Sequence, residues 1–365
     1  MKKVLIRAFV QQNLGDDLFI RILCERYPDV QFYIIGEGKY QKSVEYIKNL
    51  KYIRGDILPF KVLNAIYMKM PKNRAKENNR NVMLYNLFSR YFDENVYVTG
   101  SYFIESSYWN GLIDEKWYDN EPIIIGCNFG PYRTEQYYEA HKKQFAKTKL
   151  VSFRDRYSCE LFKDLGNVEW HPDIIFNLQV PETAEENYYV ITVVNVQKDV
   201  HVSESQNQIQ YVEKMAEISN QFCKMGNKVV FLSFCSDQGD EQVIEEILNR
   251  VEDRNQIEVK AYSTAGMEEI LKIIARCKGI VATRFHAMIL GFLFGKNTLP
   301  IVYNEKMENV LRDLQYAAKW FGIEQIDQVV CDEIDQYFGR LEEEKLNKVI
   351  VEAEKHFSLL DKIIK

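Results

Sequence analysis

The chain has 365 residues, of which 46% are hydrophobic, and 47 basic and 53 acidic residues give a formal net charge of -6. A chain of this length is longer than those that commonly fold around a single hydrophobic core, and two domains are therefore predicted. The acidic balance excludes a protein that coats nucleic acid by bulk charge, but it is compatible with a small, locally basic pocket. The seven cysteines include no CxxC pair, which is typical of reduced, buried thiols in a cytosolic protein and speaks against a zinc site.

The N-terminal run "MKKVLIRAFVQQ" is too short for a membrane span and has no small-residue cleavage site of a signal peptide. No later segment reaches the length of a membrane span. We therefore expect a soluble, cytoplasmic protein.

Short β-branched or aromatic runs alternate with longer helical patterns, which predicts parallel α/β architecture. In the first half, strands are expected at 3–9, 31–35, 96–100, 122–128 and 150–154. In the second half, they are expected at 188–194, 228–234, 257–262, 279–284 and 299–304. Two such sets predict a fold of two doubly wound, Rossmann-like domains that face a cleft, followed by a C-terminal helix.

The expected domain boundaries follow from composition. Residues 1–180 form an N-terminal domain, and Pro181–Asn187, an acidic and structure-poor stretch, forms the linker. Residues 188–330 form a C-terminal domain. Residues 331–365 have apolar residues at helical spacing and are expected to form helices packed on one domain or across both.

Polar residues follow several of the expected strands in the first half. In "NLGDD" at 13–17, Gly15 permits a tight turn and close approach of a ligand, and Asp16 or Asp17 can cap the next helix. Helix capping alone would also explain this motif. Later strand ends carry Gly100, Ser101 and Asn128, each of which could equally belong to an ordinary turn.

An arginine ends the expected strand at 150–154. Arg154 precedes a helix, and a guanidinium beside a helix N-terminus favours an anion site. The alternative is an ion pair with Asp155 or a helix-capping role. Shortly after, His171 and Asp173 of "HPD" either brace the domain junction or take part in chemistry.

The stretch "GIVATRFHAMILGFLFG" at 279–295 is the most informative. Its strand and apolar helix place Arg284 and His286 at a strand-to-helix turn. A histidine there can transfer a proton near neutral pH, and the arginine can hold an anion beside it. The next strand end supplies Lys306, so a cationic pocket with one acid–base group is expected. A satisfied structural histidine is the alternative.

Residues 61–80 carry six Lys or Arg residues interleaved with Tyr and Met. This segment is interpreted as a solvated helix and loop, or as a patch that touches anionic lipid headgroups.

Taken together, "NLGDD", "VSFRDRYS", "HPDIIF", "ATRFHAMILGFLFG" and "PIVYNEKMENVLRDL" occur in the order and rough spacing of the polysaccharide pyruvyl transferase family. The resemblance covers roughly residues 4–325. It implies a GT-B-like fold and transfer of the pyruvyl group of phosphoenolpyruvate to a sugar of a surface polysaccharide or its lipid-linked precursor. The products would be a pyruvate ketal and phosphate.

The resemblance also implies roles for individual residues. Arg154, Arg284 and Lys306 would hold the phosphate and carboxylate of phosphoenolpyruvate, which is the donor substrate, so that no cofactor or metal is required. His286 would be the catalytic acid. The reaction chemistry adds Asp16 or Asp17 as a candidate base for the acceptor hydroxyl, although helix capping would explain both residues equally well. The residues expected on the acceptor side, in the N-terminal domain, are Asn13, Gly15, Gly100, Ser101 and Asn128.

This chain has "TGSYF" where many members carry a run of glycines, and Phe285 where they carry leucine, so the acceptor sugar does not carry over. The implied partners are phosphoenolpyruvate and a sugar acceptor, with peripheral contact at the cytoplasmic face of the inner membrane and no nucleic acid. Two alternatives stay open: a GT-B glycosyltransferase that uses a nucleotide sugar, and a non-catalytic member that binds a glycan.

Overall fold

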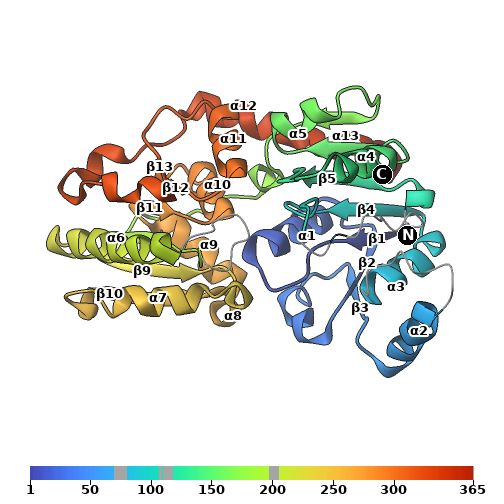
Figure 1. Cartoon of the computed structure of the whole chain (residues 1–365), viewed down its shortest axis with the longest axis horizontal. Coiled ribbons are helices and arrows are strands. Elements are labelled where there is room, and N and C mark those ends of the chain that lie inside the picture. Colours follow the sequence, from blue (N-terminus) through green and yellow to red (C-terminus); the bar gives the residue numbers. More distant parts are fainter. Residues whose placement is uncertain (70–79, 107–108, 110–117, 197–204, 365) are drawn as a thin grey trace. The chain divides into compact units, whose positions relative to one another are not determined.

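The computed structural model describes residues 1–69, 80–106, 109, 118–196 and 205–364. Two compact units make up the chain, and neither is contiguous in sequence. Unit 1 comprises Met1–Val10, Asp16–Ile174 and Glu352–Lys365, and unit 2 comprises Gln11–Gly15 and Ile175–Val351. Each unit is built on its own parallel sheet with helices around it (Figure 1).

Unit 1 holds, within the described residues, a seven-stranded sheet in the order β3-β2-β1-β4-β5-β6-β7 with every neighbouring pair parallel. Its strands are β1 (Lys3–Arg7), β2 (Gln31–Gly36), β3 (Leu50–Arg54), β4 (Glu94–Val98), β5 (Ile123–Cys127), β6 (Leu150–Phe153) and β7 (Val168–Trp170). Its helices are α1 (Leu14–Arg26), which begins in unit 2, α2 (Leu58–Lys69), α3 (Arg80–Phe88), α4 (Glu135–Phe145), α5 (Arg156–Leu161) and α13 (Ser358–Ile364).

Unit 2 holds a six-stranded parallel sheet, counted over the part of the chain that the structure describes, in the order β10-β9-β8-β11-β12-β13. Its strands are β8 (Tyr188–Thr192), β9 (Lys228–Ser233), β10 (Ile257–Ala261), β11 (Gly279–Ala282), β12 (Asn297–Val302) and β13 (Phe321–Gly322). Its helices are α6 (Ser205–Lys224), α7 (Asp240–Leu248), α8 (Tyr262–Ala265), α9 (Met267–Arg276), α10 (Phe285–Leu293), α11 (Glu305–Asp313) and α12 (Glu343–Ala353), whose end belongs to unit 1.

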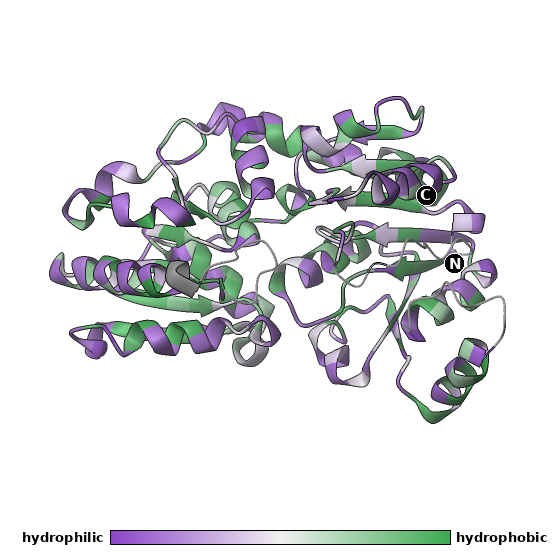
Figure 2. Cartoon of the chain, viewed as in Figure 1, coloured by the Kyte–Doolittle hydropathy of each residue, from purple (hydrophilic) through white to green (hydrophobic). Residues whose placement is uncertain are grey.

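The central strands are apolar along their whole length because helices cover both faces of a parallel sheet. All residues of β5, β8 and β11 are buried, and hydrophobic colour follows the strands in Figure 2. The outer helices show polar colour, which is the pattern of amphipathic helices on a sheet. Each strand expected from the sequence is present, and the expected class of two doubly wound α/β domains with a helical C-terminus is confirmed.

The expected boundaries and the compact units differ in three places. Gln11–Gly15, expected in the N-terminal domain, belongs to unit 2. Unit 1 gives way to unit 2 between Ile174 and Ile175, ahead of the expected linker, whose residues form neither helix nor strand. The C-terminal segment does not stay together, since residues 331–351 belong to unit 2 and residues 352–365 return to unit 1.

Buried and half-buried polar contacts attach the returning C-terminal segment to the rest of unit 1. His356 lies 2.7 Å from Ser152 Oγ through Nδ1 and 2.8 Å from the carbonyl oxygen of Pro172 through Nε2. His171 lies 3.0 Å from a carboxylate oxygen of Glu352. Asp361 accepts hydrogen bonds from Arg26 and Tyr27 at 2.8 and 2.9 Å. His171 and Pro172 of the "HPD" motif therefore contact the C-terminal segment within unit 1, whereas the expected role at the domain junction stays a prediction.

Among the described residues, no helix is both long enough and apolar enough to cross a membrane.

Two buried histidines of unit 1 predict loss of stability in acid. Burial lowers the pKa of His356 from 6.5 to about 3 and that of His141 from 6.5 to about 4. Below about pH 6.5 the unfolded chain takes up protons at these positions and the folded chain does not. The free energy of unfolding should therefore fall from about pH 6.5 towards pH 4, by up to about 1.4 kcal/mol per pH unit for each histidine.

Denaturant unfolding between pH 4 and 8 measures this dependence. His356→Gln, which cannot titrate, should show a shallower slope than the wild type over the same range. Equal slopes in both proteins would rule out His356 as a source of the acid sensitivity.

Candidate active site

Unit 2 places Arg284 and His286 where its strand order reverses. In doubly wound sheets, ligands bind outside the carboxyl ends of the strands at this reversal. Here it lies between β8, which ends at Thr192, and β11, which ends at Ala282. Arg284 is the N-cap residue of α10, and His286 lies in the first turn of that helix. The expected strand-to-helix turn is thus present, with His286 just inside the helix.

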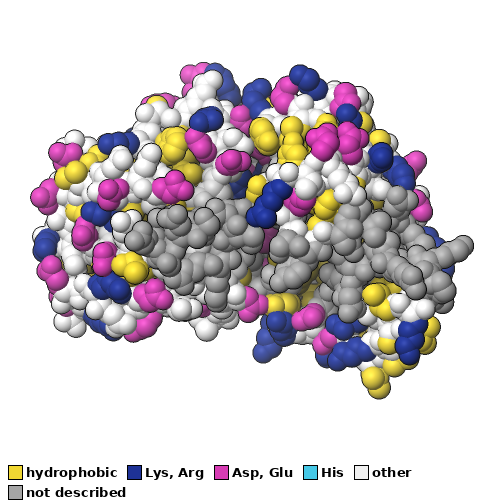
Figure 3. Space-filling model, in the orientation of Figure 1, with side chains coloured by type: hydrophobic (Ala, Val, Ile, Leu, Met, Phe, Trp, Pro, Cys, Tyr) yellow, Lys and Arg dark blue, Asp and Glu magenta, His cyan; other side chains and the backbone are white. Residues whose placement is uncertain are grey.

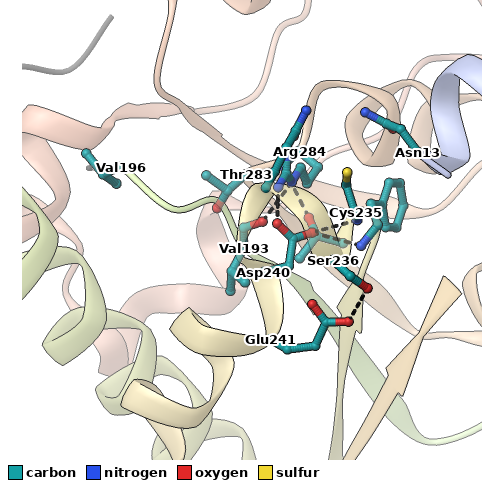
Figure 4. Close-up of polar contacts among 12 residues, drawn as sticks. Asn13, Val193, Val196, Cys235, Ser236, Asp240, Glu241, Thr283 and Arg284 are labelled. Atoms are coloured by element: carbon teal, nitrogen blue, oxygen red, sulfur yellow. Dashed lines mark hydrogen bonds and ion pairs between the residues drawn. The ribbon is translucent and has the colours of Figure 1, made fainter. Parts of the chain in front are cut away.

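Arg284 is buried, and each nitrogen of its guanidinium donates to the protein (Figure 4). Nε donates to the carbonyl oxygen of Val193 at 3.0 Å, and the terminal nitrogens donate to the side chains of Gln238 and Asp240. Its backbone N–H donates to Thr192 Oγ1 at 3.3 Å. Arg284, just after β11, is therefore hydrogen-bonded both to the end of β8 and to the segment that follows β9.

Asp240, the ion-pair partner of Arg284, is completely buried at the start of α7. Its other carboxylate oxygen accepts from the backbone N–H groups of Phe234 at 2.8 Å and Cys235 at 3.1 Å. The carboxylate balances the charge of the guanidinium in a dry environment, where an uncompensated charge would be costly. The Arg284–Asp240 pair as a whole adds no net charge to the site.

His286 lies against the backbone of Gly15 in unit 2. A methyl carbon placed on Gly15 would be 1.6 Å from Nδ1 of His286, so no larger residue fits with the imidazole in this position. Asn13 Oδ1 accepts from the Gly15 N–H at 3.2 Å, and the Leu14 N–H donates to the carbonyl oxygen of Phe234 at 3.2 Å. The predicted "NLGDD" turn thus contributes directly to the surroundings of His286.

The N-terminus of α10 has no side-chain cap, because Arg284 makes no capping hydrogen bond there. Backbone N–H groups at such an end favour an anion. The next helix differs, since Asn304 caps α11 by accepting from the Met307 N–H at 3.2 Å. Lys306 lies in the first turn of α11, with its ammonium 5.8 Å from the ring centres of Phe285 and Tyr303. Phe285 itself is buried.

A second cluster forms at the carboxyl ends of neighbouring strands in unit 1. Arg154, which follows β6, donates to Asn128 Oδ1 at 2.7 Å and to Ser101 Oγ at 3.0 Å. It also forms a fully buried ion pair with Asp173 at 3.0 Å. A methyl carbon on Gly100 would lie 2.8 Å from Nη1 of Arg154. Four residues predicted to bind substrates therefore lie together here, namely Arg154, Gly100, Ser101 and Asn128. Asp173 is part of the same cluster.

Asp155, which follows Arg154 in the sequence, acts as a helix cap. It is the N-cap of α5, and its two carboxylate oxygens accept from the backbone N–H of Ser158 at 2.8 Å and from its hydroxyl at 2.9 Å. Asp155 thus caps a helix, and Asp173 forms a buried ion pair with Arg154.

The two candidate bases differ in burial. Both lie in the first turn of α1, where Asp16 is half-buried and Asp17 is completely buried. Of the two, Asp16 is the one with surface available to a substrate.

Two residues of the unit 2 cluster, and one arginine at the strand reversal of unit 1, were not identified from the sequence. Asp240 and Gln238 lie in a loop and helix start that show no motif, although "SDQGD" does follow an expected strand. Arg7 ends β1 at the strand reversal of unit 1, donates to Tyr102 Oη at 2.8 Å and lies 4.9 Å from the ring centre of Tyr97. Burial alone would lower the pKa of Arg7, but the surrounding tyrosines raise it above its ordinary value.

The three predicted donor-binding cations are divided between the units. Arg154 belongs to unit 1, whereas Arg284 and Lys306 belong to unit 2. In the described part of the chain, no group of three or more His, Cys, Asp or Glu side chains is placed to hold a metal ion.

Solved structures with the same architecture define the class. UDP-GlcNAc 2-epimerase from Methanocaldococcus jannaschii is 11% identical, with a TM-score of 0.54 over 99% of each chain. S. aureus MnaA, solved with UDP, is 10% identical, with a TM-score of 0.57 over 100% of this chain and 96% of its own. Anabaena HepE, solved with UDP and glucose, is 11% identical, with a TM-score of 0.52 over 100% and 97%. At these identities the likeness establishes the fold alone, which is the GT-B type.

The sequence itself places the chain within this class. The family model for polysaccharide pyruvyl transferase matches residues 13–305, and the chain belongs to that transferase family. The match contains His286, Arg284 and Arg154 and ends one residue before Lys306. No curated protein matches the chain by sequence.

The contact between Gly15 and His286 predicts that Gly15→Ala displaces the imidazole. Overpacking of this kind costs about 1–3 kcal/mol of stability. The imidazole resonances of His286 in an NMR spectrum should shift, and the melting temperature should fall. Gly166→Ala is the matched control, because no atom lies within 4 Å of the added carbon. Unchanged His286 resonances in Gly15→Ala would contradict the observed contact.

The buried ion pair in unit 2 predicts a large cost for Asp240→Asn. Removing the charge of one partner leaves the other uncompensated, and such changes destabilise by about 3–5 kcal/mol. Glu252→Gln, which affects an exposed pair with Lys224, should cost less than about 1 kcal/mol. In denaturant unfolding, the double variant Asp240→Asn with Arg284→Gln should lose less free energy of unfolding than the two single variants lose in sum. Strict additivity would show that the pair is not coupled.

Proposed function

We propose that the protein transfers the pyruvyl group of phosphoenolpyruvate to a sugar of a surface polysaccharide or its lipid-linked precursor, forming a ketal and releasing phosphate. The observation that carries the proposal is the position of His286. It lies in the first turn of α10, whose N-terminus is at the strand reversal of unit 2. Arg284 occupies the N-cap position of this helix, but its side chain makes no capping hydrogen bond. An anion-binding end and an acid–base group are thus adjacent, within the matched family region.

The negative charge of the donor must be compensated although two of the three expected cations are paired with aspartates. Phosphoenolpyruvate carries about three negative charges near neutral pH. Asp173 and Asp240 balance Arg154 and Arg284, so these arginines supply hydrogen-bond donors more than net charge. We assign the compensation of the donor charge to Lys306, the α10 N-terminus and the imidazolium form of His286. That Arg154 also contacts the donor stays a prediction.

The proposed reaction has two stages. A sugar hydroxyl attacks C2 of phosphoenolpyruvate while His286 protonates the methylene carbon C3, which gives a tetrahedral adduct that still carries phosphate. The C2–O bond to phosphate then breaks, and a second hydroxyl of the sugar bonds to C2 and closes the ketal. Asp16 is the proposed base for the first hydroxyl, and the proton of the second leaves with phosphate.

The acceptor side is assigned to unit 1. Ser101 and Asn128 are oriented by Arg154, and Gly100 leaves room for its guanidinium. Polar groups held in this way suit recognition of sugar hydroxyls. If the acceptor is lipid-linked, the protein works at the cytoplasmic surface of a membrane.

The reaction is tested by incubating the protein with phosphoenolpyruvate and a panel of lipid-linked and synthetic glycosides. Released phosphate and the mass of the acceptor are followed together. The molar amount of phosphate should equal the molar amount of acceptor that has gained a pyruvyl group. Phosphoenolpyruvate should also raise the melting temperature, whereas UDP- and GDP-sugars should not. Stabilisation by a nucleotide sugar alone, without ketal formation on any acceptor, would favour the glycosyltransferase alternative.

Replacing the proposed acid predicts a loss of rate without a loss of fold. General acid catalysis is worth about 100- to 10,000-fold, so His286→Gln should lower kcat by that range while still binding phosphoenolpyruvate. His171→Gln is the matched control, since His171 contacts carboxylates of unit 1 and should keep most of the rate. A wild-type rate in His286→Gln would eliminate His286 as the acid.

A further inference from the structure

Exposed hydrophobic side chains gather on one helix of unit 1. On α2, Leu58 is 73% exposed, Val62 51% and Ile66 53%, and their spacing of four residues places them on one face. Ile57 and Leu63 are exposed beside them. Figure 3 shows hydrophobic side chains at the surface in the lower right of the view, where Figure 1 labels α2. A contiguous apolar patch of this kind marks an interaction site.

The fold does not require this outer face of α2. The helix packs on the core of unit 1 through other residues, because Tyr67 is buried and the ring of Phe60 meets that of Phe88 at 5.8 Å. The helix also follows β3, the edge strand of the sheet. Helix α2 therefore lies at the margin of unit 1 and is apolar on both its inner and its outer face.

The charge around the apolar face is positive. Lys61 and Lys69 are exposed on α2, and the helix contains no Asp or Glu. The acid just before the helix, Asp56, is paired with Arg54 at 3.1 Å. Of the basic segment singled out in the sequence at 61–80, residues 70–79 lie outside the described part of the chain.

We propose that the outer face of α2 docks on the surface of an anionic lipid bilayer. Leu58, Val62 and Ile66 would enter the boundary between headgroups and acyl chains, and Lys61 and Lys69 would contact anionic headgroups. Apolar side chains flanked by lysines, without acids, match the chemistry of such a surface. This docking rests on the composition and exposure of α2 and not on the proposed pyruvyl transfer.

The test is co-sedimentation of the full chain with vesicles of phosphatidylcholine and phosphatidylglycerol, and with vesicles of phosphatidylcholine alone. The wild type should bind the anionic vesicles more tightly. Val62→Glu combined with Ile66→Glu should weaken binding by at least about 30-fold, because apolar burial is lost and acids are added. Lys61→Gln with Lys69→Gln should weaken it by about 30-fold, which is about fivefold for each lysine.

A matched control uses equally exposed apolar residues of unit 2. Ile209 is 53% exposed and Val330 49%, so Ile209→Glu combined with Val330→Glu adds the same charge elsewhere and should leave binding at about the wild-type level apart from long-range repulsion. Circular dichroism melting of all variants confirms that they fold, which is expected for exposed positions.

Three results would overturn the proposal. They are absence of wild-type binding to anionic vesicles, equal losses in the α2 and control variants, or a dimer in light scattering that Val62→Glu and Ile66→Glu dissociate. The last would assign the face to a second copy of the chain.

Discussion

A buried guanidinium–carboxylate pair holds the carboxyl edge of each sheet. Parallel strands end in loops whose polar groups must be satisfied, and in both units an arginine within two residues of a strand end forms these hydrogen bonds. Arg284 pairs with Asp240 in unit 2, and Arg154 pairs with Asp173 in unit 1. Each pair is dry and joins loops from separate strands, so its geometry fixes the positions of the smaller polar groups beside it.

This arrangement bears on how the proposed anionic donor would be recognised. A count of cations in the sequence treats every arginine as an available positive charge, yet two of them are each paired with a buried carboxylate. The proposed donor site then consists of Lys306, N–H groups at fixed positions, a helix end without a side-chain cap and an imidazole held against a glycine. Such a site distinguishes ligands by shape and hydrogen bonding more than by total charge.

The sequence predicted most of the fold because strands buried on both faces are continuously apolar and are readily recognised. It missed β3 (Leu50–Arg54), β7 (Val168–Trp170) and β13 (Phe321–Gly322), which lie at sheet edges, are partly exposed or are very short. Position after a strand singled out Arg154, Ser101 and Asn128. Their direct contact was not predicted, since Arg154 was expected on the donor side and the other two on the acceptor side.

The same logic could not identify partners that depend on tertiary contact. Asp240 lies in a helix start like many others, and its role appears only when the loop after β9 meets Arg284. Likewise, the helical pattern of residues 331–365 predicted helices correctly, but nothing in that pattern indicates that its two parts belong to different units.

The return of the chain's end to unit 1 bears on how the protein is made. A ribosome releases the sequence from its N-terminus, and domains generally fold as their residues emerge. Unit 1 lacks the partners of Ser152 and Arg26 until His356 and Asp361 have been synthesised, after all of unit 2. Unit 2 has by then been completed, so the domain that begins first is the one that is finished last. A protein truncated before residue 352 would leave this first domain without its closing segment, however complete the rest of the chain.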